Sequence, residues 1–375
     1  MNRKELFESA KKAVVSEIDR CCKTGENRLP TARVLAEKAG CSYATMRLVL
    51  AELEREGFLC RRQGSGTYLT ECAGELSGKF LIRKLLYFCP YRLKRSDTSF
   101  NDFLTELLER ECMERGWSCT TVHVRSHDEF LRNMKVMASF YNAVVYAPVG
   151  EAFTVSHIAA LDAMRGIPLV LLDNNQSLPL PCISVDDWRG GAMAASHFLA
   201  NNHREIGLLF AEPPLQCIQE RANAFLDVVE LAGFRPYVIR AEVGRDDDRR
   251  RCARVAMEQV IRRGRLPFSA LFGVSDASAW GALDAFQNAG IRVPDEVSLI
   301  GFDGLPFNDR TSPSLCSVAQ PFPQIFEQLF RLLDSGGLPE NRKFRIPPGF
   351  KKGESVLRLP PVSLTSSPFY SLAEK

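Results

Sequence analysis

Apolar side chains recur every three or four positions in successive segments near the start of the chain, a spacing typical of amphipathic helices. Residues 3–22 form the first segment. The second begins at Thr31, a suitable N-cap, and stops at Gly40, which can end a helix. Its expected apolar stripe comprises Val34, Leu35 and Ala39.

A third helical segment follows at once, with Ser42 as its expected N-cap. Two short helices joined by a tight turn at Gly40 predict a helix-turn-helix. The apolar positions expected to be buried leave Tyr43, Ala44 and Arg47 on the opposite face, close to the helix start. A recognition helix enters the major groove by that end. The buried set comprises Met46, Val49, Leu50 and Leu53.

Strand-like alternation then flanks two glycines, at residues 58–60 and 67–69. Gly64 and Gly66 are expected to turn the chain between these strands, because glycine readily adopts a positive φ. A phosphate-binding loop would need a helix directly after the glycines, which the pattern does not predict. We therefore expect a two-stranded wing beside the helix-turn-helix, with two arginines at its base that contact phosphates, Arg61 and Arg62.

Residues 29–69 resemble the GntR family (gluconate-repressor type) of winged-helix regulators. The family usually has an arginine directly after the serine that starts the recognition helix; here Tyr43 takes that place, which leaves the base preference open. The resemblance implies that the following residues contact DNA: Arg33, Ser42, Tyr43, Thr45, Arg47, Gly64 and Gly66.

Beyond a small polar segment at 71–79, which we interpret as a linker, short apolar strands alternate with helical segments. This order is typical of βαβ units and parallel sheets, and the length suggests two doubly wound lobes. The predicted fold is therefore an N-terminal winged helix at residues 1–70, followed by an α/β two-lobed domain at 80–358 and a tail at 359–375.

Polar residues follow several of the predicted strands, and in doubly wound sheets ligands collect at the carboxyl ends of strands. Asp173, Asp303 and the pair Ser275 and Asp276 take such positions, and Arg221 lies near a helix start. Carboxylates accept hydrogen bonds from sugar hydroxyls, and arginine donates to them. Any single acid at a strand end can equally be a turn or helix-cap residue. Their recurrence favours a site for a polyhydroxylated ligand.

Residues 81–356 resemble the effector domain of the lactose/galactose repressor family, which is related to periplasmic sugar-binding proteins. The resemblance rests on segments such as "ERANAFLDVVELAG" and "ALFGVSDASAWGALDAFQNAGIRVPDEVSLIGFDGLPF". Ser275 departs from the family, where an asparagine usually precedes the aspartate. The chain as a whole is similar to chimeric regulators of the arabinose-repressor type. The resemblance implies effector contacts at Phe100, Asp173, Arg221, Ser275, Asp303, Gln320 and Phe322.

Composition adds little except in the distribution of charge. The net charge is +3, and residues 1–70 carry 13 Lys and Arg against 9 Asp and Glu. This excess suggests a polyanionic partner for the first domain. A charged segment at 244–255 is expected to be a solvated helix start, with Asp246–Arg250 and Asp247–Arg251 pairs.

Neither the 12 cysteines nor the 5 histidines show the spacing of a metal site, so we expect reduced cysteines and neither metal nor cofactor. The chain has no apolar segment long enough to span a membrane and no signal-peptide pattern, which predicts a cytoplasmic protein.

The predicted function is a DNA-binding transcription regulator, a homodimeric repressor whose affinity for its operator a small carbohydrate effector controls. The alternative is a sugar-binding protein of a transport or sensing system without a DNA role. An enzyme is not expected, because no acid–base, nucleophilic or metal constellation is present.

Overall fold

The computed structural model describes residues 3–62, 64–71, 73, 83–91, 99–163, 168–172, 178, 180–244, 247–334 and 343–361. The chain divides into two units: Met1–Lys84 with Cys112–Ser118, and the remainder. No helix in the described part is both long and apolar enough to cross a membrane. The predicted linker and tail lie largely outside the described residues, as does Asp173.

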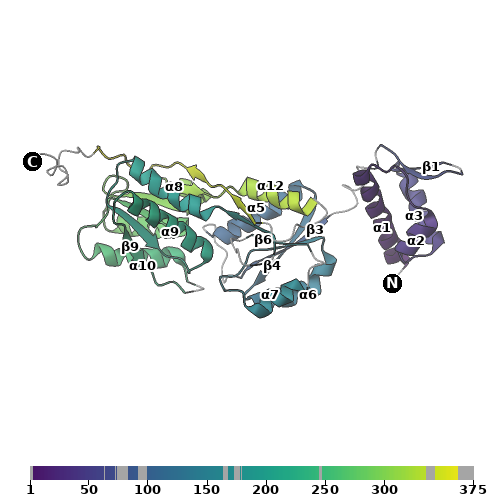
Figure 1. Cartoon of the computed structure of the whole chain (residues 1–375), viewed down its shortest axis with the longest axis horizontal. Helices are drawn as coiled ribbons and strands as arrows, with labels where there is room; N and C mark the ends of the chain where they lie inside the picture. Colours follow the sequence, from purple (N-terminus) through teal and green to yellow (C-terminus); the bar gives the residue numbers. More distant parts are fainter. Residues whose placement is uncertain are drawn as a thin grey trace, which may run out of the picture. The chain divides into compact units, whose positions relative to one another are not determined.

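The N-terminal unit contains three helices followed by a hairpin (Figure 1). Thr31 and Ser42 cap α2 and α3 as expected, each accepting a hydrogen bond from the backbone N–H three residues on. Val34 was expected in the apolar stripe of α2, but it is 41% exposed and the neighbouring Ala36 is buried instead. The helices are α1 (Arg3–Thr24), α2 (Ala32–Lys38) and α3 (Tyr43–Arg55).

The hairpin is the predicted wing. β1 (Leu59–Arg62) pairs antiparallel with β2 (Gly66–Leu69). The two wing glycines have the positive φ that the turn requires, +74° at Gly64 and +128° at Gly66. One apolar core joins the three helices to the hairpin, and it includes the four residues of α3 predicted to be buried: Met46, Val49, Leu50 and Leu53.

The second unit contains two lobes, each built on a six-stranded sheet in the described residues. The first sheet has the order β13-β7-β6-β5-β3-β4. Parallel pairing joins β3, β5, β6, β7 and β13 in turn. The strands are β3 (Arg83–Pro90), β4 (Trp117–Val124), β5 (Ala143–Tyr146), β6 (Leu169–Leu172), β7 (Cys182–Val185) and β13 (Lys343–Ile346).

Figure 1 shows the sheet of the first lobe with helices on both of its faces, α5 and α12 on one and α6 and α7 on the other. This is the doubly wound arrangement predicted from the sequence. The helices are α5 (Phe100–Glu114), α6 (His127–Met137), α7 (Val155–Asp162) and α12 (Phe322–Asp334), with a short 3₁₀ turn at Ala138–Phe140.

The second lobe repeats this topology, with the strand order β14-β12-β11-β10-β8-β9. Its strands pair in parallel except for β14, which is antiparallel to β12. The strands are β8 (Ile206–Phe210), β9 (Tyr237–Arg240), β10 (Ala270–Gly273), β11 (Ser298–Asp303), β12 (Cys316–Ala319) and β14 (Gly349–Lys351).

Alternate residues of these strands fill two separate cores, because successive side chains of a strand point to opposite faces. Leu208 and Phe272 pack with α8 and α9, whereas Leu209 and Leu271 pack with α10 and α11. Helices therefore cover both faces of this sheet too. They are α8 (Asp187–Ala200), α9 (Gln216–Leu231), α10 (Arg249–Ile261) and α11 (Asp276–Asn288), with a 3₁₀ turn at Pro306–Arg310.

The chain passes between the lobes at three described points: from β7 to α8, from β12 to α12, and from β13 to β14. Each lobe is therefore assembled from segments that are distant in the sequence. Residues near the end of the described chain also contact the second lobe, since the Leu359 N–H donates to the Asn201 carbonyl at 3.0 Å.

Candidate DNA interface and effector site

The recognition helix α3 presents its first turn to solvent. Ser42 Oγ accepts from the Thr45 N–H at 3.1 Å and lies 2.9 Å from Thr45 Oγ1, so both side chains fix the helix start. Tyr43 is 49% exposed, and Arg47 one turn later is exposed as well. Arg33 is exposed on α2. All five residues lie in the helix-turn-helix, where the sequence placed them.

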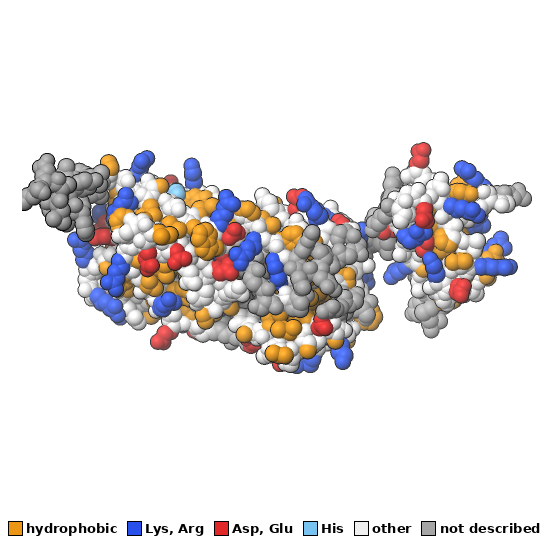
Figure 2. All heavy atoms as spheres, in the orientation of Figure 1, with side chains coloured by type: hydrophobic (Ala, Val, Ile, Leu, Met, Phe, Trp, Pro, Cys, Tyr) orange, Lys and Arg blue, Asp and Glu red, His pale blue; other side chains and the backbone are white. Residues whose placement is uncertain are grey.

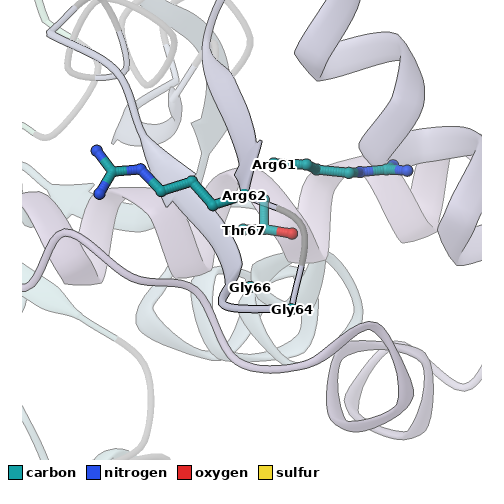
Figure 3. A pocket seen from close by; sticks show the side chains of 5 residues that line it. All are labelled: Arg61, Arg62, Gly64, Gly66 and Thr67. Atoms are coloured by element: carbon teal, nitrogen blue, oxygen red, sulfur yellow. The ribbon is translucent and has the colours of Figure 1, made fainter.

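The wing tip is a shallow hollow (Figure 3), lined by Arg61, Arg62, Gly64, Gly66 and Thr67. Gly66 is favoured by its φ of +128°, and a Cβ there would also lie 3.1 Å from Nε of Arg28, so the arginine side chain would have to shift slightly. Bare backbone of this kind can approach a nucleic-acid groove closely.

The two wing arginines point in opposite directions from β1, as Figure 3 shows. Arg61 faces α3: its Nε lies 3.3 Å from Oε2 of Glu54, and Nη2 donates to the Arg47 carbonyl at 3.4 Å. Arg62 instead places its guanidinium 4.8 Å from the ring centre of Tyr68. The sequence predicted the same role for both. Arg61 ties the wing to the recognition helix, whereas Arg62 lies on the other face of the hairpin.

Arg28 also belongs to the wing, which no sequence pattern predicted. It forms an isolated antiparallel bridge with Tyr68, and the next residue, Leu29, donates from its N–H to the Thr67 carbonyl at 2.9 Å. Its guanidinium lies 6.0 Å from the Tyr68 ring. Arg28 and Arg62 thus both place positive charge close to Tyr68. Lys and Arg side chains surround hydrophobic ones on the visible face of this unit (Figure 2).

In the second lobe, the carboxyl ends of four neighbouring parallel strands carry polar side chains. Glu212 follows β8, Ser275 follows β10, Asp303 ends β11 and Gln320 follows β12. Ser275 Oγ donates to Oε1 of Glu212 at 2.7 Å, and Gln320 Nε2 donates to Oδ1 of Asp303 at 2.9 Å. The parallel sheet therefore brings together three of the predicted effector residues, and it adds Glu212.

Arg221 joins this group from α9 and is 4% exposed. Its Nε and Nη2 donate to Oδ1 of Asp187 at 3.0 and 2.7 Å, and its Nη1 donates to the Val274 carbonyl at 2.8 Å. Nη1 also lies 3.7 Å from Oδ1 of Asp303, and the guanidinium stacks 3.6 Å from the ring centre of Phe302. Arg221 is therefore the electrostatic centre of the cluster. Asp187 was not predicted from the sequence.

Asp303 combines an unusual backbone with a perturbed carboxyl group. Its φ is +128°, a region that residues other than glycine rarely adopt and that is found at functional sites. Burial raises the pKa of its carboxyl well above the ordinary value, and the nearby Asp276 adds to this rise while Arg221 opposes it. Gln320 bonds both the side chain and the backbone of Asp303, because its backbone N–H also donates to the Asp303 carbonyl at 3.1 Å.

Asp276 takes a different role from the one predicted. It is fully buried, and its Oδ2 accepts from the Leu305 N–H and from Asn308 Nδ2, both at 2.8 Å. Its Oδ1 accepts from Ser317 Oγ at 2.6 Å. These bonds position the loop after β11, so we do not propose Asp276 as an effector contact. Ser275 likewise caps α11 through the Ser278 N–H.

The remaining predicted residues lie at the starts of two helices of the first lobe. Phe100 begins α5 and Phe322 begins α12, with ring centres 6.0 Å apart. Phe100 also packs against the apolar core around α10 and α11. Asp173 lies outside the described residues.

The charged segment at 244–255 contains a helix start, as predicted, because α10 begins at Arg249 and Asp248 caps it. Arg249 reaches the strand-end cluster, with Nε 3.4 Å from Oε2 of Glu212. Arg250 pairs with Asp284 of α11 at 2.7 Å, whereas its predicted partner Asp246 lies outside the described residues. Among those that are described, no group of three or more His, Cys, Asp or Glu residues could hold a metal ion.

Two family models match the chain. Residues 11–69 match the bacterial regulatory proteins of the gntR family, and residues 195–356 match a periplasmic binding protein-like domain. Among curated proteins, the HTH-type transcriptional repressor PurR of Escherichia coli O1:K1 is 25% identical over 243 residues, which cover 64% of this chain and 70% of PurR.

Solved structures show the same fold. A LacI family transcriptional regulator from Enterococcus faecium with bound ribose has a TM-score of 0.60 at 18% identity, and covers 74% of this chain and 100% of its own. Another from Arthrobacter sp. FB24, in complex with lactose, has a TM-score of 0.60 at 21% identity, with 73% and 99% covered. The chain therefore combines a gntR-family DNA-binding domain with a two-lobed periplasmic binding protein-like domain, and it is similar to the transcriptional repressor PurR.

Proposed function

We propose that the protein is a repressor that binds operator DNA as a homodimer and that a sugar-like effector, bound at the strand-end cluster of the second lobe, changes its affinity for DNA. The observation that carries this proposal is the exposed first turn of α3, with Tyr43 and Arg47, in the same chain as the buried cluster around Arg221. The exposed turn can contact base edges and phosphates, and the buried cluster offers hydrogen-bond donors and acceptors to hydroxyl groups.

DNA binding is proposed to use the exposed residues of α2 and α3 together with the wing. Arg47 can donate a bidentate pair of hydrogen bonds to guanine or bind a phosphate. A single winged helix makes few contacts, whereas two on a palindrome bring specific binding about 10³–10⁷-fold above non-specific binding. The residues proposed to contact DNA are Arg33, Ser42, Tyr43, Thr45, Arg47, Arg62, Gly64 and Gly66, with Arg61 holding the wing against α3.

The effector is proposed to be an uncharged carbohydrate. The carboxyl oxygens of Asp303 and Glu212 can accept hydrogen bonds from hydroxyls, and the amide of Gln320 can donate and accept. Two relatives of the same fold carry ribose and lactose, which supports a sugar here. A coupling of about 1–3 kcal/mol between the sites would change operator affinity about 5–150-fold.

Two measurements test the proposal together. A panel of sugars is screened by thermal melting, and binding to selected duplexes is followed by fluorescence anisotropy at two salt concentrations. We expect one sugar to raise the melting temperature and to change operator affinity. Stabilisation by a sugar without any DNA binding would indicate the alternative function, a sugar-binding protein of another system.

A further inference from the structure

The exposed surface of α3 carries two large hydrophobic side chains, Tyr43 and Leu48. Leu48 is 55% exposed and Tyr43 is 49% exposed. At 100° per residue, these two side chains flank the direction in which Arg47 points. Ala44 is exposed on the same face. One cation thus lies between two large apolar groups.

The core of the unit does not need either side chain. The buried side of α3 consists of Met46, Val49, Leu50 and Leu53, all 2% exposed or less. Leu48 points away from this side, whereas Tyr43 lies above Leu50 at the start of the helix, where it remains half exposed. Burying apolar surface stabilises by about 25 cal/mol per Å², and this gain is missing while the face is in water. A face of this kind is therefore suited to a partner that covers it.

In the major groove the apolar feature of the base edges is the C5-methyl group of thymine. A recognition helix lies in that groove with its N-terminal residues on the bases. Residues 43 and 48 are separated by about 7.5 Å along the helix axis, at 1.5 Å per residue. Because stacked base pairs are about 3.4 Å apart, the two side chains are far enough apart to reach different base pairs.

We propose that Tyr43 and Leu48 contact thymine methyl groups on either side of the base pair that Arg47 reads, and so select A·T pairs at those positions. The inference rests on the proposed function and deepens it by naming the base chemistry. Tyr43 stands where an arginine would favour guanine, so the substitution shifts the preference from a hydrogen-bond pattern to an apolar one.

Charge supports DNA as the partner rather than another protein. Arg47 and Arg55 share the exposed side of α3, and Arg33 is exposed on α2. The start of α3 adds the positive end of the helix dipole. An apolar strip within a cationic surface fits a groove whose floor offers methyl groups and whose rims are phosphates.

The experiment begins with the full chain and a random duplex library, from which bound sequences are selected. In the selected operator, each thymine is then replaced by deoxyuridine, which removes only the methyl group. We expect about a fourfold loss of affinity for each contacted methyl, the factor expected for one buried carbon group. Thymines outside the contacted positions should tolerate the replacement.

Two variants connect the methyl groups to the side chains. Leu48→Ala and Tyr43→Ala should each weaken binding to the thymine operator and lose the penalty for deoxyuridine at one position. Both residues are exposed and alanine favours helix, so the fold is expected to persist. Leu231→Ala is the matched control, because Leu231 is an 87% exposed leucine on α9 of the other unit; it should keep the full penalty.

The outcomes separate this inference from the proposed function. If an operator is selected but deoxyuridine costs nothing, or Leu48→Ala and Tyr43→Ala retain every penalty, the methyl contacts are refuted while DNA binding stands. If no duplex is selected above the non-specific background and Arg47→Ala changes nothing, the proposed function itself fails. If the two variants alter only the oligomeric state in sedimentation, the face binds a second copy of the chain, which also refutes the inference.

Discussion

Arg221 donates two hydrogen bonds to a single carboxylate oxygen of Asp187, from Nε at 3.0 Å and from Nη2 at 2.7 Å. Both side chains are almost fully buried, at 4% and 1% exposure. Removing one partner of a buried pair leaves the other charge without compensation, at a cost of about 3–5 kcal/mol. The pair therefore supports the folded second lobe as well as the proposed effector site.

Arg221→Ala is accordingly expected to lower the free energy of unfolding of the second lobe by about 3–5 kcal/mol, measured by chemical denaturation. The double variant Arg221→Ala/Asp187→Ala should lose much less than the sum of the two single losses, because neither member of the pair is then left buried without the other. Additive losses would contradict the pairing. A missing ligand response in Arg221→Ala is therefore ambiguous, and milder variants are needed.

Gln320→Ala is such a variant for the effector site. It removes the amide that bonds the Asp303 carboxylate but no charge, so we expect the effector's influence on operator affinity to fall several-fold while operator binding without effector is unchanged. Anisotropy titrations with and without the sugar measure both quantities. A variant that the sugar still controls as in the natural chain would remove this group from the site.

The close approach of α8 and α9 depends on Gly191. A Cβ at this position would overlap the backbone carbonyl of Arg221, which cannot move aside as a flexible side chain could. Gly191→Ala should therefore force the two helices apart and lower the melting temperature by several degrees, with a cost of more than about 1–3 kcal/mol. Gly349→Ala is the control, since its Cβ would meet open space, and should change stability by less than about 0.5 kcal/mol.

The buried carboxyls predict how stability varies with pH. Burial raises the pKa of Asp303 and of Asp276 above the ordinary value of 3.8, so the folded state binds protons that the unfolded state has released. The resulting stabilisation is complete below the unfolded pKa and is lost as pH rises through the folded pKa. As pH rises from about 5 to about 8.5, the loss of this stabilisation should lower the melting temperature.

The asparagine of Asp303→Asn cannot ionise, so this variant should show a smaller fall in melting temperature as pH rises. Asp227→Asn, at an exposed position of α9, should show the same fall as the natural chain. The difference between the two profiles isolates the contribution of Asp303 from that of other titrating groups. If both variants gave the same profile, the raised pKa would be refuted.

Arg47→Ala is expected to cost about 1–3 kcal/mol in operator binding while sugar binding stays intact. The guanidinium points away from the core, so the fold should be unaffected. Anisotropy on the selected operator and thermal melting with the sugar measure the two effects separately. Loss of sugar binding in this variant would contradict the assignment of the two functions to two domains.

Lys11 offers a test of how the recognition helix is held. Its Nζ lies 2.6 Å from Oε1 of Glu52 and 3.3 Å from Oε1 of Glu56, so it fastens α1 to the end of α3. Lys11→Ala should lower the stability of the N-terminal unit by about 1–3 kcal/mol. Lys12→Ala, an exposed neighbour, should have little effect; equal losses in both would show that the contact to α3 is unimportant.

Local chemistry made the winged helix and the parallel sheets predictable. Thr31 and Ser42 cap their helices through backbone groups three residues away, and Gly64 and Gly66 turn a hairpin within their own immediate surroundings. Each of these features depends on a few consecutive residues. The place of Asp303 at a strand end could also be predicted, because a parallel sheet gathers the carboxyl ends of its strands on one edge.

The partners of these residues could not be predicted from the sequence, because packing between elements far apart in the sequence determines them. Arg221 was predicted to contact a ligand, and the structure adds its pairing with Asp187, 34 residues earlier in the chain. Arg61 was predicted to contact phosphates, and it pairs with Glu54 of α3. The alternation of residues along a strand indicates opposite faces, but only the folded unit shows what each face meets.

By itself, the sequence determined the elements, their order and the general location of both sites, since caps, turns and apolar periods act over a few residues. Only the tertiary structure decided that Asp276 supports a loop, that Glu212 and Arg249 join the strand-end cluster, and that Leu48 remains exposed beside Arg47. Burial and pairing across long separations depend on how helices and sheets pack in three dimensions, and no local pattern encodes that packing.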